Sequence, residues 1–364
     1  MAVAGMNASR RLLRLQRMLL PAARSHRSLE VIQKPVTQTV YLSSTHVSQT
    51  CQENDIPYPL TEDEAFWFLQ NVLAMDKPQE LLRKDRCEFL DSFTHLMNVK
   101  IPFTNIHILA GQDLTSLTCP TLQECKEAMM KCYGGNCVYI NIFSKALLDV
   151  LGFKTFHVGA NNPGEALFDS HVSTIVSDLS HPGSQHLVDP GTIRPLFEAI
   201  PLDFEKESPV YQFNYIKVKF FKRDHGILLS CSQVPRPEKA SPSVFEDKGS
   251  FWKVELVYRL RAPRSRAYWL NRMKYRYCFP TMIPHIFHNI GVFGYVNDKC
   301  VIIGSVGDMF ALKYQHSDPS QAEMMFLPKD EFLELMGKEF PQFTMQMIEN
   351  ALVNANYVRN IYNY

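Results

Sequence analysis

One cysteine stands where a reactive thiol could be presented. Cys137 follows two glycines in Tyr133-Gly-Gly-Asn-Cys137, and the apolar run from Val138 to Leu151 has helical spacing that ends at Gly152. Glycines permit a sharp turn, so the pattern predicts Cys137 at a helix N-terminus. There the helix dipole can lower a cysteine pKa from about 8.5 to roughly 3.5–7.5. The spacing indicates a thiolate nucleophile, and the alternative is a small apolar residue packed under a turn.

A thiolate nucleophile needs a base, and the base needs an orienting acceptor. His171 opens the β-type run His-Val-Ser-Thr-Ile-Val, and Asp189 closes the run His-Leu-Val-Asp after one turn. If these runs pair as a hairpin across residues 180–185, the imidazole and the carboxylate come near the same sheet edge. Each residue alone is more often structural. Together they predict a triad in which Cys137 is the nucleophile, His171 the base and Asp189 the orienter.

The segments that must position these residues change in type along the chain. An N-cap at Thr61 and helical periodicity predict a helical first part, with helices over about 61–72, 81–97 and 119–130. Beyond Gly152, short β-branched runs between turn residues predict an antiparallel sheet or small barrel. Later segments predict a strand at 251–260, a hairpin turning at Asn297-Asp298, and helices at 328–340 and 344–357.

Composition excludes several classes of protein. The 364 residues carry 46% hydrophobic and 21% charged side chains with a net charge of +1, as in ordinary globular chains, so nucleic acid is not an expected partner. The nine cysteines form no CxxC pair and no zinc-type Cys/His cluster, which favours a reducing compartment without structural disulfides or a metal. No apolar run approaches the ~18 residues of a membrane span.

The N-terminal segment, residues 1–50, differs from the rest. No acid occurs from Met1 to Leu29, where arginines alternate with leucines as on an amphipathic helix. This segment resembles a mitochondrial presequence. The alternative is a disordered basic tail or a surface helix on a cytoplasmic protein, and either way we expect it to lie outside the fold.

A second acid-free stretch separates Glu255 from Asp298. Basic and aromatic residues alternate in it, as in clusters that bind the phosphates of a nucleotide-bearing cofactor, an anionic lipid surface or RNA. A solvated mixed face is the alternative. The candidate phosphate contacts are Arg259, Arg261, Arg272 and Lys274.

The motifs around the candidate nucleophile resemble those of the arylamine N-acetyltransferases. That family carries Arg-Gly-Gly-x-Cys, then Asn, then a helix ending in Leu-Gly-Phe; this chain has Tyr133-Gly-Gly-Asn-Cys137, Asn141 and Leu151-Gly-Phe153. The family's Pro-Phe-Glu-Asn-Leu is similar to the run from Pro102 to Ile106. Its Val-Asp-Val-Gly-Phe-Gly is similar to the run from Val188 to Ile193. The order Cys, His, Asp agrees, and the similarity covers about residues 55–200.

This resemblance implies a fold and a reaction. The fold is α+β, with a cysteine-protease-like core: a helical domain at 55–152 carries the nucleophile, an antiparallel β-barrel at 153–249 carries His and Asp, and an α/β lid occupies 250–364. The reaction is ping-pong transfer of acetyl from acetyl-CoA, through a Cys137 thioester, to an arylamine, arylhydroxylamine or hydrazine. No metal is implied, and the oligomeric state is left open.

Three departures from the family pattern keep alternatives open. Tyr133 replaces the family Arg, and Thr104 replaces a Glu. After Asp189, Pro190 and the pair Thr192-Ile193 alter the loop that shapes the family's acceptor and cofactor clefts. One alternative is a transglutaminase- or peptidase-like cysteine enzyme. The other is a catalytically divergent binding module of the same fold.

Overall fold

The computed structural model describes residues 56–111, 119–163, 169–278, 287–296, 299–306, 309–315 and 323–361. The chain divides into two compact units, Met1–Asp55 and Ile56–Tyr364, and every element named below belongs to the second. The basic segment expected to act as a presequence lies outside the described residues, as does the expected turn at Asn297-Asp298.

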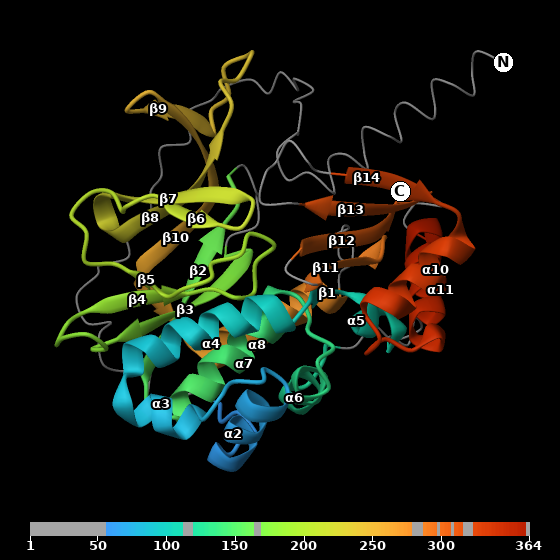
Figure 1. Ribbon diagram of the computed structural model, residues 1–364, viewed down its shortest axis with the longest axis horizontal. Helices are drawn as coiled ribbons and strands as arrows, with labels where there is room; N and C mark the ends of the chain where they lie inside the picture. The colour runs from blue at the N-terminus through green and yellow to red at the C-terminus, as the bar shows by residue number, and fades with distance from the viewer. Residues whose placement is uncertain are drawn as a thin grey trace. The chain divides into compact units, whose positions relative to one another are not determined.

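The first part of the second unit is helical, as predicted (Figure 1). Its helices begin at residues with the local chemistry of caps. Thr61 and Thr121 each form a capping box with a glutamate three residues later, and the Asp85 carboxylate accepts from two N–H groups of the next helix. The helices are α2 (Glu62–Asn71), α3 (Pro78–Lys84), α4 (Arg86–Lys100), α5 (Ile106–Ala110), α6 (Leu122–Met130) and α7 (Cys137–Val150).

The central part is one antiparallel sheet in the order β5-β4-β3-β2-β10-β8-β7-β6, with β9 paired to β10. It curls as a half-barrel in Figure 1. Its strands are β2 (Lys154–Asn161), β3 (His171–Ser177), β4 (Gln185–Val188), β5 (Ile200–Pro201), β6 (Tyr211–Phe213), β7 (Ile216–Arg223), β8 (Ile227–Val234), β9 (Val244–Asp247) and β10 (Ser250–Arg264).

Strand β10 extends the central sheet beyond residue 250, where we expected the lid domain to begin. It pairs with β2 on one side and β8 on the other, so it occupies the middle of the sheet. A helix, α8 (Arg266–Cys278), then leads toward the C-terminal part. The central sheet therefore ends at Arg264, the last residue of β10. Strands β2 and β8 do not pair with each other, and β10 lies between them and pairs with both.

The C-terminal part, which we call the lid, contains a second antiparallel sheet in the order β1-β11-β12-β13-β14 and two helices. Its edge strand β1 comes from the helical part of the chain. Helix α10 packs on β13, and α11 packs on α5. The elements are β1 (Phe103–Thr104), β11 (Gly291–Val296), β12 (Lys299–Val306), β13 (Met309–Gln315), β14 (Glu323–Leu327), α10 (Lys329–Glu339) and α11 (Met345–Ile361).

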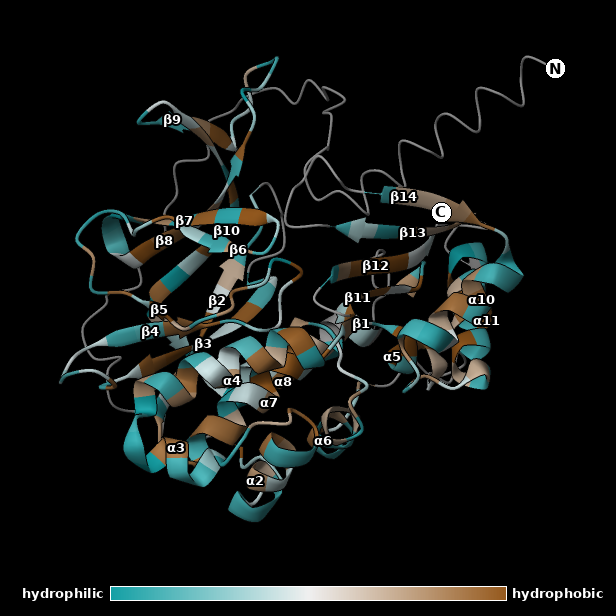
Figure 2. Ribbon diagram, in the orientation of Figure 1, coloured by the Kyte–Doolittle hydropathy of each residue, from teal (hydrophilic) through white to brown (hydrophobic). Residues whose placement is uncertain are grey.

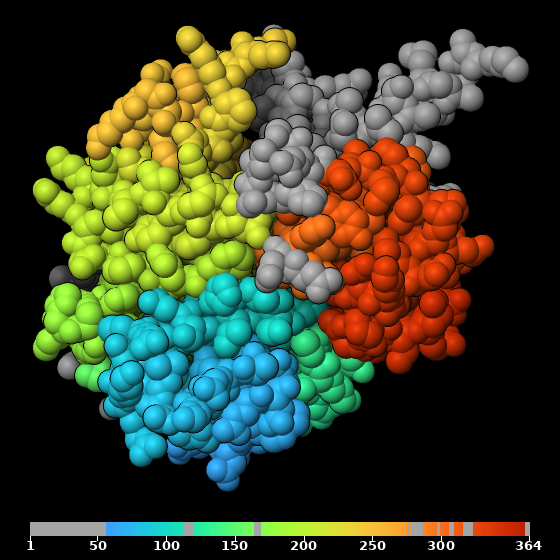
Figure 3. All heavy atoms as spheres, in the orientation of Figure 1, coloured from blue at the N-terminus to red at the C-terminus, as the bar shows by residue number. Residues whose placement is uncertain are grey.

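Helix α7 is shared by two hydrophobic cores. Phe143 and Leu147 lie in a core with residues of α2 and α4, whereas Val138 and Ile142 lie in a core with α8 and the lid. Twelve of its 14 residues are buried, and Figure 2 colours it largely hydrophobic. In the space-filling view the helical part and the lid meet in a continuous surface (Figure 3). The expected α+β arrangement is confirmed, and the element that carries Cys137 is fixed on both sides.

Candidate active site

Cys137 is the first residue of α7, as predicted. Asn136 is the N-cap, and its side-chain oxygen accepts from the N–H groups of Val138 at 3.0 Å and Tyr139 at 3.4 Å. Its Nδ2 donates to the Tyr277 hydroxyl at 2.8 Å. The cap therefore ties the nucleophile's turn to α8 as well as to α7.

The two glycines before Asn136 are required by space as well as by conformation. Gly134 has φ +71° and Gly135 has φ +155°. A Cβ on Gly134 would lie 1.9 Å from the Pro102 carbonyl oxygen, and one on Gly135 would lie 2.5 Å from the Tyr139 Cβ. The Thr104 N–H donates to the Gly135 carbonyl at 3.0 Å. The turn is thus clamped against the segment that begins with Pro102.

His171 and Asp189 meet through the predicted hairpin. Strands β3 and β4 pair with Thr174 opposite Val188, so one further step sets Asp189 opposite Ser173 and diagonal to His171. The Nε2 atom of His171 lies 2.7 Å from Oδ2 and 2.9 Å from Oδ1 of Asp189. The carboxylate is completely buried, and His171 is only 8% exposed.

Asp189 receives three further hydrogen bonds. Ser173 Oγ and the Tyr258 hydroxyl each donate to Oδ2 at 2.9 Å, and Asn141 Nδ2 donates to Oδ1 at 2.8 Å. Burying a carboxylate is costly unless its oxygens are satisfied. Together with His171, these donors from β3, α7 and β10 provide hydrogen bonds to both oxygens of the Asp189 carboxylate and fix its orientation.

Cys137 completes the group through its contact with His171. Burial lowers the pKa of His171, but the charge and hydrogen bond of Asp189, together with a hydrogen bond and charge interaction with Cys137, raise it overall to about 10. Because Asp189 engages Nε2, Nδ1 is the ring nitrogen left for the thiol. The imidazole is therefore charged at neutral pH, and an imidazolium beside a cysteine stabilises the thiolate form of the nucleophile.

The raised pKa of His171 predicts how stability depends on pH. The pKa moves from 6.5 to about 10 on folding, so the stabilisation is complete below pH 6.5 and is lost as the pH rises toward 10. We expect the unfolding free energy of the wild type to fall from pH 7 to pH 10 by more than that of His171→Gln. Urea unfolding of both proteins at the two pH values measures the difference, and equal losses would contradict the charged imidazole.

Asn141, one turn after Cys137, joins the region around Cys137 to the loop that follows Asp189. Besides Asp189, its Nδ2 donates to the Val172 carbonyl at 2.5 Å, and its Oδ1 accepts from the Gly191 N–H at 3.1 Å. A Cβ on Gly191 would lie 2.6 Å from Asn141 Nδ2 and 3.0 Å from the Cys137 Cα. The altered loop therefore still packs directly on the nucleophile.

Two of the departures from the family motifs have clear structural roles. The Tyr133 ring stacks with His107 at 6.0 Å and with Phe343 at 6.1 Å between centroids. The Thr104 hydroxyl donates to the Gly291 carbonyl at 2.9 Å. Each residue joins the segment around the nucleophile to the lid, so aromatic and backbone contacts stand at the positions where the family has Arg and Glu.

The four candidate phosphate contacts do not share one environment. Arg259 Nη1 pairs with Asp169 Oδ1 at 2.9 Å, so it already has an anionic partner within the chain. Arg261 lines a surface pocket of about 710 Å³ beside the β7–β8 turn. Arg272 is half-buried and Lys274 exposed on α8. The acid-free stretch between Glu255 and Asp298 thus has an acidic partner, Asp169, from another part of the chain. Asp169 also accepts hydrogen bonds from Arg264 and the Tyr268 hydroxyl.

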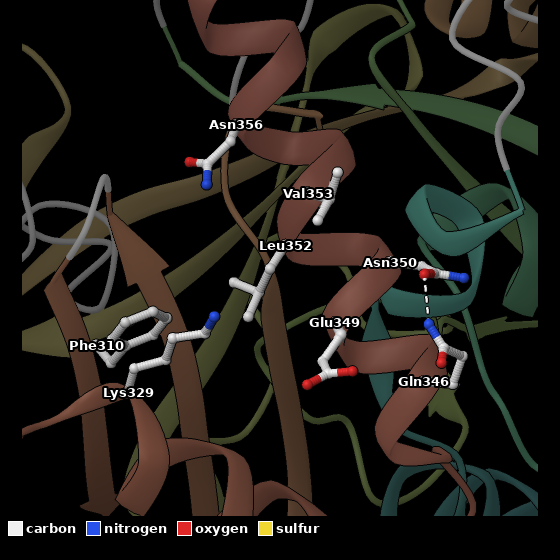
Figure 4. A pocket seen from close by; sticks show the side chains of 8 residues that line it. All are labelled: Phe310, Lys329, Gln346, Glu349, Asn350, Leu352, Val353 and Asn356. Atoms are coloured by element: carbon white, nitrogen blue, oxygen red, sulfur yellow. Dashed lines mark hydrogen bonds between the residues drawn. The ribbon is translucent and has the colours of Figure 1, made fainter.

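Another pocket, of about 590 Å³, lies on the lid between β13, α10 and α11 (Figure 4). Phe310, Lys329, Glu349 and Val353 are among its lining side chains, and Cys137, His171 and Asp189 are not. Within the described ranges, no group of three or more His, Cys, Asp or Glu side chains is arranged to hold a metal ion. No helix in that part of the chain is long and apolar enough to cross a membrane.

Sequence reasoning missed two of the donors to Asp189. Ser173 lies two residues after His171 on the same strand, so the period of two could have placed both side chains on one face. Tyr258 reaches Asp189 from β10, 69 positions along the chain. No local pattern signals that contact, because it depends on the strand order of the sheet.

Comparison with solved structures relates this fold to one family. The arylamine N-acetyltransferase from Mycobacterium abscessus superposes with a TM-score of 0.60 at 14% identity, over 81% of this chain and 96% of the other. The enzyme from Salmonella typhimurium gives 0.59 at 16% identity, over 79% and 98%. The enzyme from Mycobacterium marinum in complex with CoA gives 0.57 at 13% identity, over 79% and 98%. No protein-family model and no curated protein sequence matches the chain.

The chain therefore has the arylamine N-acetyltransferase fold, as its motifs predicted. Its sequence is only 13–16% identical to these structures, so the chain is divergent. The superpositions cover nearly the whole length of each structure, so the overall fold is shared.

Proposed function

We propose that this protein is an N-acetyltransferase that moves an acetyl group from acetyl-CoA through Cys137 to an arylamine, arylhydroxylamine or hydrazine. The observation that carries the proposal is the buried pair of His171 and Asp189, whose Nε2 and Oδ2 atoms are 2.7 Å apart, beside the cysteine at the N-terminus of α7. The likeness to solved arylamine N-acetyltransferases, one of them in complex with CoA, supports the class of reaction and the donor.

The residues can carry out both half-reactions with balanced proton transfers. The Cys137 thiolate attacks the thioester carbonyl, and the departing CoA thiolate takes a proton from the His171 imidazolium. The acceptor amine then attacks the acetyl-cysteine and gives a proton to the neutral imidazole, which restores the thiolate and the imidazolium. Asp189 holds the ring in the orientation that both transfers need. An aromatic amine suits this scheme because it is poorly basic and stays neutral at physiological pH.

Intact-protein mass spectrometry after incubation with acetyl-CoA and no acceptor tests the proposal. We expect the wild type to gain one acetyl group and Cys137→Ala to gain none. Cys87→Ala is the matched control, since Cys87 is a half-exposed cysteine on α4, and it should behave as the wild type. Addition of an aromatic amine or hydrazine should then discharge the acetyl group.

The absence of Cys137-dependent acetylation would contradict the proposal. If a longer acyl-CoA acylates Cys137 instead, only the identity of the acyl donor in the proposal is wrong. Cleavage of a peptide or amide substrate would favour the related cysteine enzymes, and no reaction with any of them would favour a binding module of the same fold.

A further inference from the structure

A group of charged side chains lies where the lid faces the central sheet. Arg194, five residues after Asp189, places Nη2 2.6 Å from Glu255 Oε2 on β10. Lys253, two residues earlier on β10, places Nζ 3.3 Å from the same oxygen. Glu255 is buried, and its other oxygen accepts from Ser232. One carboxylate therefore serves two cations beside the loop that packs on Cys137.

A third cation, Lys313 on β13 of the lid, is linked to this pair through Tyr215 and Cys300. Tyr215 hydrogen-bonds to Cys300 on β12 and lies within electrostatic reach of Arg194, and Cys300 in turn lies within reach of Lys313. Lys313 is only 6% exposed, and burial lowers its pKa. Among the described residues we find no ion pair or side-chain hydrogen bond for its ammonium group. A buried charge is costly to the fold unless it is paired, so a lysine with no partner among the described residues is suited to bind an anion.

A row of paired residues across the lid sheet connects Lys313 to the turn that precedes Cys137. Gly135 bridges to Phe103, which pairs with Phe293 on β11, and Ile302 on β12 joins Phe293 to Lys313 on β13. These are four steps of about 4.8 Å each, or roughly 19 Å along the sheet. Directly paired residues of an antiparallel sheet share a face. One row of the sheet thus runs from the nucleophile's turn to an unpaired cation.

This geometry suits a ligand with a reactive group at one end and a dense negative charge at the other. Three cations against one carboxylate leave an excess of two positive charges. The row between them and Gly135 is apolar, with Phe103, Phe293 and Ile302 on it. An extended pantetheine arm separates a CoA thioester from its phosphates by a comparable span.

We propose that Lys313, with Arg194 and Lys253, binds the phosphate groups of the nucleotide-bearing acyl thioester whose acyl carbon reaches Cys137. The inference rests on the proposed function and names the donor-binding residues of that site. It differs from the phosphate contacts expected in the acid-free stretch, where Arg259 already pairs with Asp169.

The test compares acetylation of Cys137 by acetyl-CoA with acetylation by S-acetylpantetheine, the same thioester without phosphates or nucleotide. We expect Lys313→Met to slow the reaction with subsaturating acetyl-CoA by about tenfold, as loss of one charged hydrogen bond implies, and to leave the reaction with S-acetylpantetheine unchanged. Methionine keeps the length of the side chain and removes an unpaired buried charge, so the variant should fold. Lys338→Met is the matched control, because Lys338 is an exposed lysine of the same lid, and both donors should react with it as with the wild type.

Added salt gives a second readout. It should slow wild-type acetylation by acetyl-CoA more than acetylation by S-acetylpantetheine, and Lys313→Met should reduce that difference. Equal losses with both donors, or no loss with either, would overturn the assignment of Lys313. If neither donor acetylates wild-type Cys137, the proposed function itself fails, and that outcome is distinct from the other two.

Discussion

Asp189→Asn is expected to slow acetylation of Cys137 by about 10³- to 10⁴-fold, the loss found when the orienting carboxylate of such a triad becomes an amide. Asp189 is the main contributor that raises the pKa of His171, so the pKa of the imidazole is expected to fall in the variant. The asparagine side chain also has an NH₂ group where Asp189 has an oxygen that accepts hydrogen bonds. This NH₂ group would meet the donors of Asn141, Ser173 and Tyr258 and could not accept from them. The ring therefore loses the carboxylate that favours its charged form and fixes its orientation.

Pre-steady-state acetylation, followed by intact mass, measures this loss. Ser173→Ala is the matched control, because it removes one donor to the same carboxylate and keeps the carboxylate's charge. We expect that variant to lose no more than about tenfold, in line with one hydrogen bond. An Asp189→Asn protein that is folded by circular dichroism and keeps a tenth of the wild-type rate would refute the role given to Asp189.

Gly134→Ala is expected to lower the unfolding free energy by more than about 3 kcal/mol. Its φ of +71° strains any residue with a Cβ, at a cost of about 1–2 kcal/mol. The new methyl group would also lie 1.9 Å from the Pro102 carbonyl oxygen, and a backbone atom cannot move aside as a flexible side chain can. Relief requires the nucleophile's turn to separate from the segment that leads into β1.

Gly152→Ala isolates the conformational part of this effect. Gly152 ends α7 with φ +77°, and a Cβ there meets nothing within 4 Å. The unfolding free energy of Gly152→Ala should therefore fall only by the cost of the positive φ, about 1–2 kcal/mol. Urea denaturation of both variants gives the comparison. Equal losses would show that Pro102 does not hold the turn as tightly as the structure implies.

The local parts of the site could be predicted from the sequence. The helix that begins at Cys137 and the hairpin of β3 and β4 rest on periodicity, glycines and turn residues within about 20 positions of one another, so short-range patterns contain them. The hairpin register alone brings His171 and Asp189 together. The motifs of a known family then indicated the overall arrangement, which solved structures of that family share.

The remaining features depend on contacts between distant positions. The place of β10 in the middle of the central sheet, the Tyr258 bond to Asp189 and the Asp169 partner of Arg259 each join segments about 70 or more residues apart. Arginines in an acid-free run of sequence can still be ion-paired in space when a distant carboxylate folds back on them. That is why the basic stretch looked like an anion site and Lys313, a single lysine in an apolar strand, did not.

Strand β1 has a consequence for how the protein is made. It belongs to the lid sheet, pairs with β11, and adjoins the glycine turn that presents Cys137, while Asn105 exchanges hydrogen bonds with Asn289 and Gly291. These partners leave the ribosome some 185 residues after Asn105. During synthesis the turn before Cys137 therefore cannot gain its contacts with the lid sheet until residues 289–296 have been made, so this part of the site forms late in folding.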